Sequence, residues 1–213
     1  MSEEILRNIA EAVLEGNVKQ TTAYVQEAVE GGVSAGKILN DGLIVGMNEV
    51  GELFKDGEMF VPEVLVSAKA LQGGIDVIRN LLVEEGVERK GRILTVTVEG
   101  DLHDIGIKLV GMMLEGAGFE VINIGIDVQA AQIAEKVKEY SPDILGMSAM
   151  LTTTMAKMKE VIDVLKEEGL SDSTKVMIGG APTSPMYAEK IGAVYSEDAS
   201  SAVEAAKRLL RVA

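Results

Sequence analysis

The first 88 residues carry hydrophobic side chains at a spacing of three to four positions, which predicts amphipathic helices. Four such stretches are separated by glycine-containing breaks at Gly16-Asn17, Gly31-Gly32 and Asp56-Gly57. Ser34 suits the N-cap of the third helix, and Pro62 suits the first turn of the fourth. Four amphipathic helices joined by short turns predict a small four-helix bundle.

From Arg92 onward, short apolar runs alternate with helix-like stretches. The expected strands are 93–98, 119–124, 143–148, 175–178 and 193–195, and the expected helices are 107–116, 130–140, 155–168, 184–191 and 202–210. Alternating strands and helices predict a parallel sheet covered on both faces. We therefore expect an α/β protein. A helical cap domain over residues 1–88 precedes a doubly wound, Rossmann-like or flavodoxin-like, five-stranded parallel sheet domain over residues 89–213.

The composition argues against some classes of binding partner. A net charge of −14 argues against nucleic acid and anionic membranes as partners, because both select basic patches. The chain has no cysteine and therefore no disulfides. Its acidic N-terminus has no signal-peptide character, and no apolar run is long enough to cross a membrane. We expect a cytoplasmic protein.

The only histidine, His103, lies in the loop 99–106 between the first predicted strand and the first helix behind it. Asp101, two residues earlier, can accept one ring N–H, which leaves the lone pair of the other ring nitrogen free. A zinc site needs three or four protein ligands and is hard to build from one histidine and no cysteine. A metal at His103 must bring its other ligands, as a macrocycle does. By itself the pattern also fits a metal-free loop histidine that is hydrogen-bonded to Asp101.

Two further motifs follow predicted strands, Ser148-Ala149-Met150 and Gly179-Gly180. Together with Asp101–Gly106 they resemble the cobalamin-binding fingerprint D-x-H-x-x-G … S-x-L … G-G, and residues 107–147 and 151–178 between them match the spacing of that family. Met150 replaces the usual leucine, a swap that conserves volume.

The resemblance extends into the helical half. Residues 47–54 and 59–63 are similar to the helical cap that precedes this fold in methionine synthase. Residues 107–108 depart from the family, since relatives often have Lys-Asn where this chain has Ile-Lys. The layout is that of the free-standing corrinoid proteins of methyltransferase systems.

The resemblance implies cobalamin as cofactor, in its methylcobalamin and cob(I)alamin forms. It implies His103 as the lower axial ligand of cobalt, with Asp101 and Thr154 completing a hydrogen-bonded relay behind the imidazole. The further cofactor-binding residues that it implies are Gly100, Leu102, Asp104, Ile105, Gly106, Ser148, Met150, Thr152, Gly179, Gly180 and Ala199, with Phe54 and Val61 in the cap.

Several of these residues also fit simpler roles. The two glycines at 179–180 suit an ordinary turn at a strand end, and the threonines at 152–154 suit a helix N-cap. Ala199 follows Asp198 at the start of the last predicted helix, and Phe54 equally suits the core of the bundle.

The function implied by the resemblance is a methyl carrier. It would receive a methyl group through a donor-specific methyltransferase and deliver it to a second methyltransferase that acts on tetrahydrofolate or a thiol. A reductive activase is a further expected partner. The chain has no barrel-sized partner domain, so we expect a subunit without a complete active site of its own. The alternatives are a cobalamin-dependent sensor or regulator, the cobalamin subunit of a mutase, and, outside the family, a flavodoxin-like receiver or nucleotide-binding domain.

Overall fold

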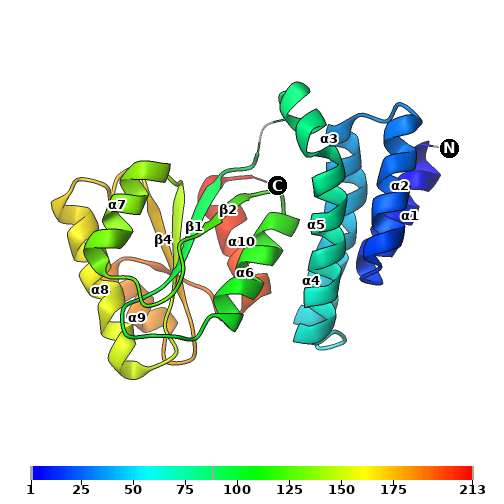
Figure 1. The fold of residues 1–213 in the computed structure, drawn as a ribbon. Coiled ribbons are helices and arrows are strands. Elements are labelled where there is room, and N and C mark those ends of the chain that lie inside the picture. The colour runs from blue at the N-terminus through cyan, green and yellow to red at the C-terminus, as the bar shows by residue number, and fades with distance from the viewer. Residues whose placement is uncertain (1, 88, 213) are drawn as a thin grey trace. The chain divides into compact units, whose positions relative to one another are not determined.

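The computed structural model describes residues 2–87 and 89–212. The chain divides into two compact units, one formed by Met1–Arg89 with Gly116–Gly118 and the other by Lys90–Glu115 with Phe119–Ala213. The first unit is helical and the second contains the sheet (Figure 1). The domain boundary expected between residues 88 and 89 stays a prediction, and Glu88 itself lies outside the described residues.

The helical unit contains all four predicted helices. Its elements are α1 (Ser2–Leu14), α2 (Val18–Glu30), α3 (Ala35–Ile38), the π-helical turn η1 (Leu39–Leu43), α4 (Ile44–Lys55) and α5 (Val61–Glu84). The side chains of Asn17 and Ser34 accept hydrogen bonds from backbone N–H groups in the first turns of α2 and α3. Within the described part of the chain, no helix is long and apolar enough to cross a membrane.

The third predicted helix differs from the expectation, because η1 interrupts it between α3 and α4. Next to this turn, glycines allow a close approach to α1. A Cβ on Gly46 would lie 2.4 Å from the carbonyl oxygen of Ala10, and one on Gly42 would lie 3.1 Å from Cγ2 of Ile9. The hydrophobic spacing did not reveal η1, since Leu39, Leu43 and Met47 recur every four residues, as they would in an unbroken α-helix.

A long-range cap links the end of α5 to the start of α3. The carboxylate of Glu85, just after α5, accepts hydrogen bonds from the backbone N–H groups of Ala35 at 2.8 Å and Gly36 at 3.0 Å. These two hydrogen bonds hold the pKa of Glu85 below its usual value. They satisfy donors that the first turn of α3 leaves free.

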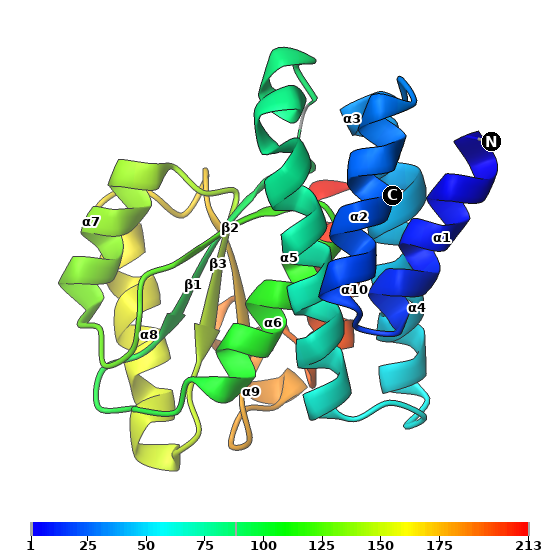
Figure 2. The same cartoon turned by 45° about the vertical axis from the view of Figure 1, so that its right-hand side comes forward.

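The second unit is the predicted five-stranded parallel sheet, in the order β2-β1-β3-β4-β5. Its strands are β1 (Arg92–Thr97), β2 (Glu120–Asn123), β3 (Ile144–Ser148), β4 (Lys175–Gly179) and β5 (Val194–Tyr195). Its helices are α6 (Ile105–Gly116), α7 (Ala130–Tyr140), α8 (Thr152–Glu167), α9 (Pro185–Ile191) and α10 (Ala199–Leu210). Helices α7 and α8 cover one face of the sheet, and α6 and α10 cover the other (Figure 2).

Three of these helices begin earlier than the hydrophobic spacing predicted. Helix α6 starts two residues early, at Ile105, and α8 and α10 start three residues early, at Thr152 and Ala199. Their first turns carry loop residues whose side chains are polar, small or exposed, so they add little to the apolar stripe.

The two faces of the sheet differ in chemistry. Leu94, Val96, Leu145, Met147 and Ile178 belong to the apolar core shared with α7, α8 and α9. Residues paired across parallel strands share a face, so the opposite face presents two rows, Thr95–Gly146–Met177 and Thr97–Ser148–Gly179. The row at the carboxyl ends of the strands therefore consists of small or hydroxyl residues.

Candidate functional site

The three motifs meet at the carboxyl edge of the sheet, where ligands of open α/β folds bind. The N–H of Val98, directly after β1, donates to the carbonyl of Ser148 at 3.2 Å. The N–H of Ala149 donates to the carbonyl of Gly179 at 3.3 Å. These backbone contacts set the first motif beside the second and the second beside the third.

The buried carboxylate of Asp101 is the centre of the site. Its Oδ2 accepts hydrogen bonds from the backbone N–H of Met150 at 2.6 Å and from the hydroxyl of Thr154 at 2.7 Å. Its Oδ1 accepts from the backbone N–H of His103 at 3.1 Å and lies 2.7 Å from Nδ1 of the imidazole. The predicted contacts of Asp101 with His103 and Thr154 are thus both present, and the Met150 N–H is an addition.

These contacts decide the charge of Asp101. Burial raises the pKa of its carboxyl, but the hydrogen bonds from Met150, Thr154 and His103 outweigh burial and hold the pKa well below its usual range. The group is therefore ionised at neutral pH and can only accept hydrogen bonds.

An ionised Asp101 requires the hydrogen of a neutral His103 ring to sit on Nδ1, which leaves the lone pair on Nε2. The His103 side chain is 57% exposed. Among the described residues, nothing forms a hydrogen bond with Nε2. The imidazole thus offers one free nitrogen to solvent or to a metal.

Thr154 has two roles at once. It stands in the first turn of α8, where its hydroxyl oxygen accepts from the N–H of Leu151 at 3.3 Å, as a capping residue does. The same hydroxyl donates to Asp101. The relay and the capping interpretations of the threonine run therefore both describe Thr154, whereas Thr152 is exposed.

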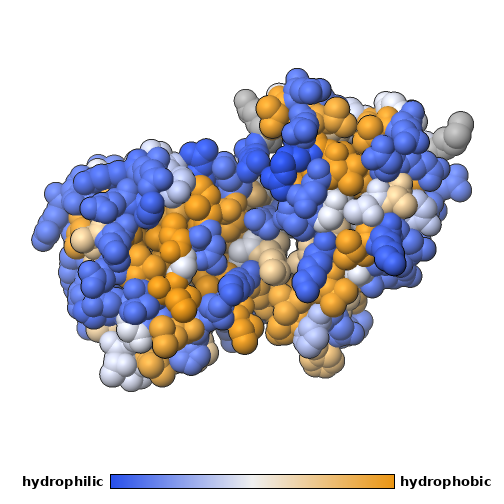
Figure 3. Space-filling view, in the orientation of Figure 1, coloured by the Kyte–Doolittle hydropathy of each residue, from blue (hydrophilic) through white to orange (hydrophobic). Residues whose placement is uncertain are grey.

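An apolar rim surrounds His103. Leu102 and Ile105 are 68% and 69% exposed, and Met150 and Leu151 are 40% and 46% exposed. In the described part of the sheet unit, the exposed large hydrophobic side chains all follow the carboxyl end of a strand: Leu102, Ile105, Ile126, Met150, Leu151 and Met186. Hydrophobic surface reaches the lower end of the sheet unit in Figure 3. Asp104, in the same loop, forms an ion pair with Lys108 on α6.

Two residues of the site were missed by the sequence interpretation. The hydroxyl of Thr97 donates to the carbonyl of His103 at 3.0 Å. Thr95 is fully buried, and its hydroxyl has no hydrogen-bond partner among the described residues. Buried hydroxyls are usually paired, so Thr95 marks the face of the sheet as suited to a polar ligand. The available signal was the alternation of threonine with Leu94, Val96 and Val98 along one strand.

The glycines of the motifs lie in different local surroundings. Gly180 has a φ of +114°, and a Cβ there would lie 1.9 Å from the carbonyl oxygen of Ala149. A Cβ on Gly179 would lie 3.0 Å from the carbonyl oxygen of Ser196. Packing within the protein thus accounts for both glycines, and their contact with the cofactor stays a prediction. Gly106 is different, because nothing outside its own helix lies within 4 Å of a Cβ placed there.

The remaining predicted residues are placed as follows. Ser148 and Ala199 are buried, at the end of β3 and the start of α10. Phe54 and Val61 are half-buried, near the end of α4 and at the start of α5. Both belong to the helical unit, so their contact with a cofactor held at His103 stays a prediction.

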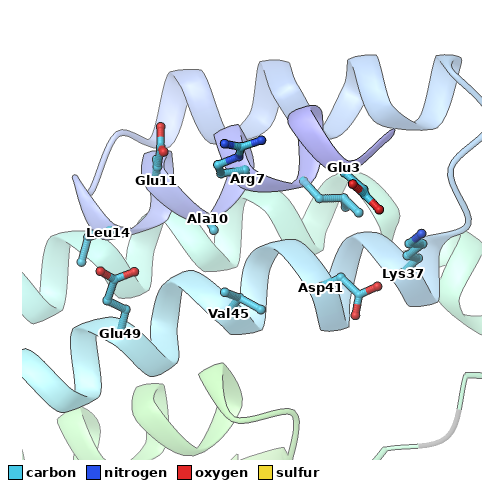
Figure 4. Close-up of a pocket in the computed structure, with 10 residues that line it drawn as sticks. Glu3, Arg7, Ala10, Glu11, Leu14, Lys37, Asp41, Val45 and Glu49 are labelled. Atoms are coloured by element: carbon cyan, nitrogen blue, oxygen red, sulfur yellow. The ribbon is translucent and has the colours of Figure 1, made fainter. Parts of the chain in front are cut away.

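A groove of about 630 Å³ lies within the helical unit, between α1 and the segment from α3 to α4 (Figure 4). Its rim carries charged side chains of both signs, and its floor is apolar. The lining residues are Glu3, Leu6, Arg7, Ala10, Glu11, Leu14, Lys37, Asp41, Val45 and Glu49. None of the predicted site residues is among them.

The sheet unit fits a corrinoid. It offers a single exposed imidazole nitrogen, an apolar rim for a flat macrocycle, and a sheet face of small residues with an unpaired buried hydroxyl. Among the described residues, no group of three or more His, Asp or Glu side chains could hold a metal ion. A metal at His103 must therefore draw its other ligands from a bound group.

Comparison with known proteins gives the same assignment. Two family models, each described as a B12 binding domain, match residues 91–206 and 5–79. The chain is 46% identical to dimethylamine corrinoid protein 1 of Methanosarcina acetivorans over 98% of both chains.

Two solved structures are also similar. One is the methanol:cobalamin methyltransferase complex of Methanosarcina barkeri, at 32% identity and a TM-score of 0.88 over 98% of this chain and 80% of that one. The other is a cobalamin-binding protein of Desulfitobacterium hafniense, at 34% identity and a TM-score of 0.79 over 96% and 98%. These matches confirm the predicted fold and cobalamin as the cofactor. The chain belongs to the B12-binding family, among the corrinoid proteins of methyltransferase systems.

Proposed function

We propose that this chain is a methyl carrier in which His103 binds the cobalt of a corrinoid. When bound, the corrinoid supplies the cobalt centre on which a methyl group can be carried. The observation that carries the proposal is the buried, ionised Asp101, which holds Nδ1 of His103 at 2.7 Å and leaves Nε2 free. A metal that is already held by a macrocycle needs only one further donor from the protein. A fixed imidazole nitrogen can be that donor.

The protein groups behind the imidazole have separate roles in this proposal. Asp101 keeps the hydrogen on Nδ1 and increases the electron density at Nε2. Thr154 and the Met150 N–H hold the other carboxylate oxygen, so Asp101 cannot turn away from the ring. A change in the bonding of Nε2 would alter the Nδ1–H hydrogen bond to Asp101. The exposed apolar side chains of Leu102 and Ile105 beside His103 would contact a flat macrocycle bound there.

The name of one relative supports a proposal for the methyl donor. The M. acetivorans relative is named a dimethylamine corrinoid protein, so we propose a methylated amine as the methyl source, delivered through a donor-specific methyltransferase. A second methyltransferase, acting on tetrahydrofolate or a thiol, would take the methyl group, and a reductive activase would restore oxidised cofactor. In this scheme the chain has no complete active site alone. Phe54 and Val61 remain proposed apolar contacts of the cofactor.

Histidine labelling tests the ligand, because the chain has one histidine. The protein is loaded with hydroxocobalamin and reduced to Co(II), and its electron spin resonance spectrum is recorded with ¹⁴N- and ¹⁵N-histidine. We expect nitrogen splitting whose multiplicity changes with the label. His103→Ala should still bind the corrinoid but lose this splitting.

Glu99→Ala serves as the control, since Glu99 lies in the same loop but pairs with Lys157 rather than with the ring. It should keep the nitrogen splitting. Splitting that does not respond to the histidine label would contradict the assignment of His103.

A further inference from the structure

Backbone hydrogen bonds join the loop between β2 and α7 to residues 97–101, which lead into the loop that carries His103. The N–H of Thr97 donates to the carbonyl of Gly125 at 3.0 Å, and the N–H of Val128 donates to the carbonyl of Thr97 at 3.3 Å. The N–H of Asp127 donates to the carbonyl of Asp101 at 3.1 Å. These three bonds are between backbone atoms, so they do not depend on which side chains the loop carries.

A fourth bond depends on the side chain of Asp127. Its Oδ1 accepts the backbone N–H of Gly100 at 2.7 Å. Asp127 therefore holds the Gly100–Asp101 dipeptide at both ends, through its carboxylate at the N–H of Gly100 and through its own N–H at the carbonyl of Asp101. A hydrogen bond to a charged acceptor at this distance is among the stronger kinds.

The backbone at Asp127 is unusual as well. Its φ of +54° lies in the left-handed region, which costs most residues energy and which aspartate and asparagine tolerate better than others. The other acidic side chains near the motif are used differently, since Glu99 pairs with Lys157 at 3.3 Å and Asp104 pairs with Lys108. Among the described residues outside the loop 99–106, Asp127 is the one whose carboxylate accepts a hydrogen bond from the backbone of that loop.

We propose that Asp127 is a positioning residue for the cobalt ligand. By fixing the backbone of Gly100 and Asp101, it sets where the Asp101 carboxylate stands, and through that carboxylate it sets the orientation of the His103 ring. Met150 and Thr154 fix the carboxylate from the α8 side, and Asp127 fixes its main chain from the α7 side. The effect on the imidazole is a property of the protein alone, whereas the effect on cobalt ligation rests on the function proposed above.

Two variants isolate the side-chain hydrogen bond. Asp127→Asn keeps an oxygen acceptor in a residue that tolerates a positive φ. Asp127→Gly accepts the same φ without strain but has no acceptor. Asp172→Gly, in an exposed loop, is the matched control for the change to glycine. Circular dichroism and thermal unfolding are used to check that each variant is folded.

The first readout is nuclear magnetic resonance of the cofactor-free protein labelled with ¹⁵N-histidine, whose single ring gives one set of signals. We expect a downfield Nδ1–H resonance in the wild type, in Asp127→Asn and in Asp172→Gly. It should broaden or vanish in Asp127→Gly. The amides of Asp101 and His103 should exchange with solvent about tenfold faster in Asp127→Gly, because a hydrogen bond to a charged group anchors this turn.

The second readout is hydroxocobalamin affinity, which should fall by about tenfold in Asp127→Gly and recover in Asp127→Asn. The inference is overturned if Asp127→Gly keeps the Nδ1–H resonance and the amide protection, or if Asp127→Asn fails to restore them. If the wild type shows the Nδ1–H resonance but no histidine splitting on cobalt, the proposed ligation fails, and only the positioning of the imidazole by Asp127 stands.

Discussion

At the residue scale, four hydrogen bonds converge on the carboxylate of Asp101. They overcome the cost of burying a charge, which otherwise amounts to several kcal/mol. The ionised group then determines which nitrogen of His103 carries the hydrogen. One buried side chain thus sets the chemistry of an exposed one. The donors to the Asp101 carboxylate come from its own loop, from the loop after β3 and from the first turn of α8.

A substitution at Gly106 can test the stability of the fold and the binding of the cofactor separately. It lies in α6, and nothing outside that helix lies within 4 Å of the position that a Cβ would take. Since alanine is favoured over glycine in a helix, we expect Gly106→Ala to raise the free energy of unfolding of the cofactor-free protein by up to about 1 kcal/mol. If the space belongs to the corrinoid, hydroxocobalamin affinity should fall by about tenfold or more.

Denaturant unfolding and spectrophotometric titration measure these two effects of Gly106→Ala. An unchanged affinity would show that the motif keeps this glycine for a reason other than contact with the cofactor.

At the scale of elements, the contact of α1 with α4 depends on a glycine that the fold itself requires. A Cβ on Gly46 would meet the carbonyl oxygen of Ala10 at 2.4 Å, and Val13 is also in contact there. A backbone atom cannot move aside as a flexible side chain can, so Gly46→Ala should lower the free energy of unfolding by about 1–3 kcal/mol. Chemical denaturation measures the loss.

The matched comparison for Gly46→Ala is Gly106→Ala, the same substitution at a helical site with open space. The two changes should have opposite signs. Equal stability of wild type and Gly46→Ala would mean that α1 and α4 separate at little cost.

At the scale of the whole molecule, the chain is built as two compact units. Glu85 ties the end of α5 to α3, so the connection between the units begins after it. Arg89 is exposed in this connection. We expect brief trypsin treatment of the cofactor-free protein to cleave first after Arg89 or Lys90, because exposed segments with few backbone hydrogen bonds are cut most readily.

Mass spectrometry identifies the first fragments. Replacement of both basic residues by glutamine should delay the cleavage, because trypsin cuts after arginine or lysine. A first cut inside β1 would contradict the division near residue 88.

Local signals along the chain were enough to predict the helical bundle and the five parallel strands, and motifs that directly follow parallel strands must share one edge of the sheet. These signals are a repeat of three to four residues, the alternation of strand and helix, and motifs placed directly after strands. The pairing of Asp101 with His103 was also predictable, because two residues in one loop cannot lie far apart.

The remaining features depend on contacts between residues distant in sequence, so they emerge only when the chain is folded. The π-turn beside α1, the Met150 donor at Asp101 and the unpaired hydroxyl of Thr95 leave no mark on the hydrophobic spacing. The hold of Asp127 on Gly100 joins loops that follow different strands. Gly180 and Gly106 look alike in the motifs, yet folding places the backbone of Ala149 against one and leaves open space beside the other.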